Sequence, residues 1–224
     1  PLKSEGQSAR CIRGLARSPR VTNCLSPLQM HPARMDRKSG KSLSPTCFLN
    51  AVESPELGLL GGYLAVSPEG RPLEFRCTTP VRASRAQEIL YGATLAEHLH
   101  SDVLGLPLLT GARLRPPLIL APDAKWRQLA WHVDAQIVQL AQVESSATRD
   151  MHLPDEDGGR TIGPFRVQQI DGQPLEPAAL DSLDHLSRYV RPDEPFERIS
   201  LALEEVLLTS AASVSGADTH DAAA

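Results

Sequence analysis

The chain has 224 residues, of which 41% are hydrophobic and 22% charged, and its formal net charge is −4. These values fit one folded domain with tails and exclude a chain that is disordered throughout. The charge is divided unevenly: residues 1–45 carry a net +7, and residues 46–224 carry a net −11. Because an acidic surface repels phosphate groups, we do not expect the body of the protein to bind nucleic acid.

Residues 1–45 are predicted to be a disordered basic leader. Residues 1–34 show neither helical nor strand periodicity, and their Arg-, Ser- and Pro-rich composition suggests sequence upstream of the native start. We interpret Met35, or alternatively Met30, as that start. A basic segment of this kind is also able to bind polyanions by itself.

The protein is expected in the cytoplasm. No apolar run approaches the roughly 18 residues of a membrane span, and the leader lacks the apolar core of a secretory signal. The body contains only two cysteines, Cys47 and Cys77. Two cysteines at this spacing do not form a disulfide framework or a zinc site, so we expect reduced thiols.

Three antiparallel strands are predicted at the start of the body, over residues 46–52, 57–66 and 72–78. Turn sequences rich in Ser, Pro and Gly separate them, and the third strand alternates apolar and charged residues. The pair Gly61-Gly62 indicates a bulge or a close approach of another segment to the second strand.

Helices and strands then alternate. Ser84 and Gln87 form a capping box at the start of a helix, and a second helix is predicted from 94 to 104, interrupted by Gly105 and Pro107. An apolar run at 116–121 fits a buried strand. A short helix over 125–131 and a strand over 135–142 follow.

The remaining sequence predicts a polar linker over 143–163 and a C-terminal subregion over 164–209 with a strand and two amphipathic helices. Residues 210–224 are predicted to be a disordered tail. The two helices, over 175–190 and 194–209, are expected either to pack on the sheet or to present a face to a protein partner or a second copy of the chain.

The predicted fold is therefore α/β, with a mixed sheet that begins with a three-stranded antiparallel meander, continues with alternating helices and strands, and is followed by C-terminal helices. Over about residues 46–142 this order resembles the ribonuclease-H-like fold. The resemblance implies catalytic carboxylates on the first strand and near the end of the fourth. In this sequence Glu53 comes just after the first predicted strand, and Asp123 follows the fourth.

The stretch GYLAVSPEGRPLEFRCTTPVRASRAQEILYG, residues 62–92, resembles segments of uncharacterised proteins from planctomycete-type bacteria. This resemblance covers only the middle of the chain. It implies no activity, and it supports residue 46 onward as genuine coding sequence.

No phosphate-binding loop, dinucleotide fingerprint, metalloprotease helix or nucleophile elbow is present, so the sequence assigns no cofactor. The candidate catalytic residues are Asp123, Glu53 and Cys77. Asp123 and Glu53, with Asp102 and Asp134 as alternatives, are carboxylates that a two-metal hydrolytic site requires. Cys77 is a nucleophile candidate with His98 or His100 as its base.

A helical fragment Glu97-His98-Leu99-His100 has metal-binding residue types, but the two histidines point about 200° apart on a helix, so no metal site is assigned. Arg76, Arg82 and Arg85 are predicted to hold an anionic ligand at a helix start. The alternative is that these are surface arginines paired with Glu74 and Glu88.

Because no catalytic motif stands out, the sequence favours a non-enzymatic binding or regulatory module. The alternative is a metal-dependent hydrolase or nuclease with ribonuclease-H-like architecture, acting through Asp123 and a second carboxylate.

Overall fold

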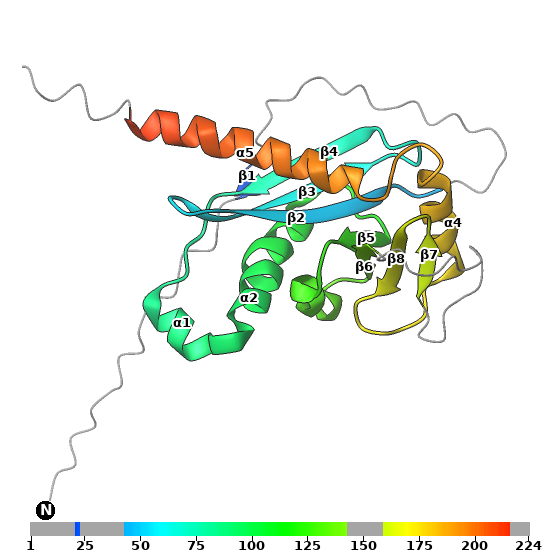
Figure 1. Ribbon diagram of the computed structural model, residues 1–224, viewed down its shortest axis with the longest axis horizontal. Coiled ribbons are helices and arrows are strands. Elements are labelled where there is room, and N and C mark those ends of the chain that lie inside the picture. Colours follow the sequence, from blue (N-terminus) through cyan, green and yellow to red (C-terminus); the bar gives the residue numbers. More distant parts are fainter. Residues whose placement is uncertain (1–20, 23–42, 143–158, 216–224) are drawn as a thin grey trace, which may run out of the picture.

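The computed structural model describes residues 21–22, 43–142 and 159–215 (Figure 1). Within these residues the chain forms one mixed sheet, with strands in the order β1-β4-β3-β2-β5-β6-β8-β7. Helices cover both of its faces. The prediction of an α/β fold built on a mixed sheet is confirmed.

The centre of the sheet consists of five strands. β2 (Thr46–Ser54), β3 (Gly58–Val66) and β4 (Pro72–Thr78) pair antiparallel with their sequence neighbours. β5 (Leu118–Ala121) lies parallel to β2, and β6 (Gln136–Gln142) lies parallel to β5. All four side chains of β5 are buried, as its continuous apolar run predicts.

Two additions extend the sheet at its edges. A hairpin of β7 (Arg160–Ile162) and β8 (Phe165–Gln169) joins β6 through antiparallel pairing of β8. The end of the predicted 143–163 linker is therefore a strand, while residues 143–158 lie outside the described residues. At the opposite edge β1 (Val21–Thr22), from the predicted leader, pairs with Cys77 and Thr78 of β4.

Short helical segments follow on one side of the sheet: α1 (Arg85–Tyr91), η1 (Gly92–Thr94), α2 (Leu95–His98), the π-helical η2 (Leu99–Gly105), α3 (Leu106–Gly111) and the 3-10 helix η3 (Ala124–Trp131). Of these, η2, α3 and η3 pack against the sheet and cover this face. The predicted interruption at Gly105 and Pro107 is absent, since helical backbone continues through both. Pro107 lies in the first turn of α3, directly after the π-helical turns of η2. Gly105 allows Leu129 of η3 to approach, because a Cβ there would lie 2.7 Å from Leu129 Cδ1.

The other face is covered by α4 (Pro177–Leu186) and α5 (Glu194–Ser215). Figure 1 shows α5 lying along β2 and β3, on the side of the sheet opposite to α1 and α2. The helix continues to Ser215, beyond the predicted end at 209, so the first six residues of the predicted disordered tail are helical. No helix in the described part of the chain is long and apolar enough to cross a membrane.

Each face of the sheet has its own apolar core. Phe48, Leu64 and Leu120 point toward α4 and α5, and Leu49 and Tyr63 point toward η2, α3 and η3. The strands are therefore buried on both sides, which gives the molecule three layers.

Candidate functional site

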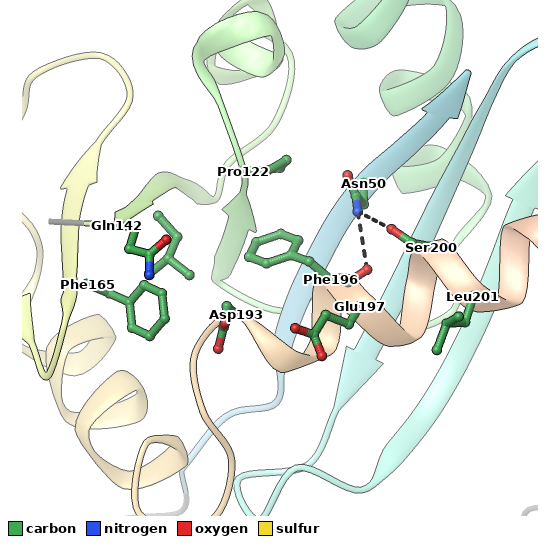
Figure 2. Close-up of a pocket in the computed structure, with 10 residues that line it drawn as sticks. Asn50, Pro122, Gln142, Phe165, Asp193, Phe196, Glu197, Ser200 and Leu201 are labelled. Atoms are coloured by element: carbon green, nitrogen blue, oxygen red, sulfur yellow. Dashed lines mark hydrogen bonds between the residues drawn. The ribbon is translucent and has the colours of Figure 1, made fainter. Parts of the chain in front are cut away.

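A cavity of about 600 Å³ lies between the sheet and the first turns of α5. We call it the α5 cavity. Pro122, which follows β5, and Gln142, at the end of β6, form part of its wall, so it opens near the carboxyl ends of these parallel strands (Figure 2). Ligands of open α/β sheets commonly bind at this edge.

The wall of the α5 cavity is mainly apolar. Figure 2 shows Phe165 of β8 and Phe196 of α5 on different sides of the space. Both are buried, and the Phe196 ring also packs edge-on against Phe48 with 5.3 Å between centroids. Leu140 and Leu201 complete the apolar lining, and Leu201 is 67% exposed at the outer side. Such a wall favours an apolar ligand group.

Asn50 is the polar residue that β2 contributes to the cavity. Its Nδ2 donates to the Phe196 carbonyl (3.2 Å) and to Ser200 Oγ (3.0 Å), as Figure 2 shows. Its Oδ1 accepts from the backbone N–H of Ala51 (2.9 Å). The amide is therefore engaged with the protein, and it fixes α5 against β2.

Two acidic residues of the α5 cavity lie at the start of α5. Asp193 and Glu197 line the cavity, and Arg191 contacts both, with 3.4 Å from its Nε to Asp193 Oδ1 and 3.4 Å from its Nη2 to Glu197 Oε1. The cavity thus combines an apolar interior with a charged rim.

Most of this lining could not be recognised from the sequence. Asn50 did carry a signal, because it is a polar residue at an inward position of an alternating strand, between Phe48 and Val52. The lining residues of α5 carried none, since their relation to the sheet depends on packing across more than 140 residues of sequence.

Asp123, predicted as a catalytic carboxylate, caps η3. Its Oδ1 accepts from the Lys125 N–H (2.9 Å), and its Oδ2 lies 2.9 Å from Lys125 Nζ. Glu53 lies inside β2 rather than after it, with an exposed side chain. Neither residue lines the α5 cavity.

The charges of Glu53 and Asp123 both influence the pKa of His100. Burial lowers the pKa of the His100 imidazole, while the Ala96 carbonyl and the charges of Asp123 and Glu53 act in the opposite direction. Among the described residues no group of three His, Cys, Asp or Glu side chains has the arrangement of a metal site.

The other acidic and histidine candidates lie away from the α5 cavity and have contacts of their own. Asp102 Oδ2 lies 2.8 Å from His98 Nδ1, while its Oδ1 lies 3.8 Å from His132 Nε2. Asp134 is exposed, and Glu97 accepts a long 3.5 Å hydrogen bond from Gln128.

Of the two cysteines of the body, which were expected to be reduced thiols, Cys47 is free and Cys77 is not. Cys77 is disulfide-bonded, and a sulfur in a disulfide is not a thiolate nucleophile. The edge pairing of Thr22 with Cys77 brings the leader to this position, which the sequence did not predict. Cys47 is free and fully buried, and burial raises the pKa of its thiol. It is therefore a packing residue.

The three predicted anion-binding arginines have separate contacts. Arg76 Nη1 lies 3.7 Å from Glu74 Oε1, and Arg85 Nη1 lies 2.8 Å from Glu88 Oε2. These are the pairs with Glu74 and Glu88 that were expected if the arginines do not bind an anion. Arg82 donates to the Pro55 carbonyl. None of the three lines either described cavity.

No family model matches this chain, and no curated protein was found to be similar to it. The fold and site define it as a mixed-sheet α/β protein with a cavity under its C-terminal helix.

Proposed function

We propose that this chain is a non-enzymatic binding module that takes a small, mainly apolar molecule into the α5 cavity. The observation that carries the proposal is the 600 Å³ space with apolar walls at the carboxyl edge of β5 and β6. Its volume lies within the usual range of about 300–1,000 Å³ for small-molecule sites.

A ribonuclease-H-like order over residues 46–142 is part of this proposal. It is supported by the three antiparallel strands β2, β3 and β4, followed by β5 parallel to β2 and β6 parallel to β5. The resemblance implies a carboxylate on the first strand. In β2 the residue that faces α5 and the cavity is Asn50, whereas Glu53 belongs to the alternating set that faces the opposite side.

The uses of the polar groups also favour binding over catalysis. Asn50 and Ser200 bond to each other, Asp123 caps η3, and Asp193 and Glu197 pair with Arg191. None of these contacts joins a nucleophile to a general base.

The test uses N-phenyl-1-naphthylamine, a neutral aromatic probe whose fluorescence increases in apolar surroundings. We expect saturable binding to the wild-type chain. Leu201→Glu places a charge at the apolar wall and should weaken binding about tenfold or more, which corresponds to about 1.4 kcal/mol.

Leu208→Glu is the matched control, because Leu208 lies two turns along α5, is also 67% exposed and does not line the cavity. It should bind the probe like the wild type. Light scattering on both variants checks the oligomeric state, so that the predicted dimer through the C-terminal helices is tested in the same samples. Absence of saturable binding, or equal weakening by the two substitutions, would overturn the proposal.

The alternative function is a metal-dependent hydrolase or nuclease. It is favoured by the positions of Glu53 near the end of β2 and Asp123 just after β5, because the two strands are parallel and their carboxyl ends lie at one edge of the sheet. Thermal unfolding with and without Mn²⁺ decides between the two: a higher midpoint in the wild type that Asp123→Asn abolishes would support the hydrolase.

A further inference from the structure

A second cavity, of about 440 Å³, lies between the β7–β8 hairpin and the C-terminal end of α4. Three arginines line it, Arg160, Arg188 and Arg191, against one carboxylate, Asp184. We call it the arginine cavity. Its surplus of positive charge contrasts with the net −11 of residues 46–224. The nearest charges act most strongly on a bound group, because dissolved salt screens charges that lie more than about 10 Å away.

The three arginines differ in how firmly they are held. Arg160 Nη2 lies 2.7 Å from Asp184 Oδ2, a close pair that uses the one carboxylate of the cavity. Arg188 is exposed and forms no ion pair within the part of the chain that the structure describes. A guanidinium with five donors is therefore available at the wall of this cavity.

Arg191 is held only loosely. Its two contacts, with Asp193 and Glu197, are both 3.4 Å long, and its side chain is 66% exposed. Charge-assisted hydrogen bonds of full strength are about 2.7–2.9 Å long. Arg191 can accordingly exchange these partners for a ligand anion at little cost.

The arginine cavity adjoins the α5 cavity. Phe165 lines both. The loop between α4 and α5 separates them, with Pro192 in the wall of the arginine cavity and its neighbour Asp193 in the wall of the α5 cavity. The two spaces therefore share one aromatic wall residue and lie on either side of this loop.

We propose that the arginine cavity holds the anionic group, a carboxylate or phosphate, of a ligand whose apolar body fills the α5 cavity. This inference rests on the proposed binding function and specifies the class of ligand, an amphipathic anion. Arg188 and Arg191 bind the anion, since a guanidinium matches the geometry of both oxyanions, and Arg160 stays with Asp184.

The test displaces bound N-phenyl-1-naphthylamine with three ten-carbon compounds below their aggregation concentrations: decanoate, decyl phosphate and decanol. The two anions should displace the probe at about tenfold lower concentration than the neutral alcohol, as expected for one charge-assisted hydrogen-bonded group. The comparison of decanoate with decyl phosphate identifies which oxyanion is preferred.

Arg188→Glu should remove the advantage of the anions and leave displacement by decanol unchanged. Arg127→Glu, at an exposed arginine of η3 that lines neither cavity, is the matched control and should keep the advantage. Equal displacement by decanol and the anions in the wild type, or an advantage that survives Arg188→Glu, would overturn this inference while leaving the proposed function intact. If the probe itself does not bind, the proposed function fails first.

Discussion

At the scale of single residues, Asn50 joins the sheet to α5 through two hydrogen bonds from its amide nitrogen, to the Phe196 carbonyl and Ser200 Oγ. Asn50→Ala removes both and should lower the free energy of unfolding by about 1–3 kcal/mol. Ser200→Ala removes one bond and should cost about 1 kcal/mol. Urea unfolding of the two single variants and the double variant measures the coupling, and strictly additive effects would contradict the direct bond.

The predicted carboxylates Asp123 and Glu53 show how much of the site could be predicted from the sequence. Asp123 and Glu53 were recognised as acids near strand ends, and they do lie there. Their surroundings decide their roles: Asp123 accepts a hydrogen bond from the Lys125 backbone, and the Glu53 side chain is exposed. The residue types showed that these carboxylates could take part in catalysis. Only the structure shows which atoms surround each carboxylate, and therefore which role it has.

At the scale of secondary-structure elements, Gly61 and Gly62 let helices approach β3 from both faces. A Cβ on Gly61 would lie 2.9 Å from Leu104 Cβ, and one on Gly62 would lie 2.5 Å from Ile199 Cγ2. Gly62→Ala should therefore displace α5 and lower the free energy of unfolding by about 1–3 kcal/mol. Chemical unfolding measures this loss.

Ile199→Ala supplies the matching test of that contact. Alone it opens a cavity under α5 and should cost about 2–5 kcal/mol, because Ile199 is fully buried. Combined with Gly62→Ala, it makes room for the new methyl group, so the double variant should lose less than the sum of the two single losses. A loss equal to or greater than that sum would show that the two residues do not compete for space.

At the scale of the whole molecule, the strands and the C-terminal helices share one apolar core. Phe48, Leu64 and Leu120 from the strands are buried with Leu183 of α4 and Ile199 of α5. A shortened chain of residues 43–142 would expose this face of the sheet to water. We expect it to unfold without a cooperative transition, whereas residues 43–215 should unfold cooperatively.

Circular dichroism during thermal unfolding checks this prediction. A sharp transition in the 43–142 chain would show that the predicted α/β core is independent of α4 and α5. The physical reason is the loss of buried apolar area. Without α4 and α5, one entire face of the sheet no longer contributes hydrophobic free energy to folding.

The sequence by itself determined where strands and helices form, because alternation, helical periodicity and capping depend on residues within a few positions of one another. The strand over 72–78 and the capping box at Ser84 are examples. Edges were less predictable: the pairing of β1 with β4, the strand β7 and the continuation of α5 to Ser215 involve contacts or helix propagation that local patterns do not encode.

Only the tertiary structure decided which residues form the two cavities. Asn50, Phe165 and Ser200 come from β2, β8 and α5, and Arg160 meets Arg188 and Arg191 across the β7–β8 hairpin and the end of α4. These groups converge because burying both faces of the sheet draws distant segments together, and the hydrophobic driving force for that burial is not directional. The neighbours of each side chain, and therefore its use, follow from the packing of the complete chain.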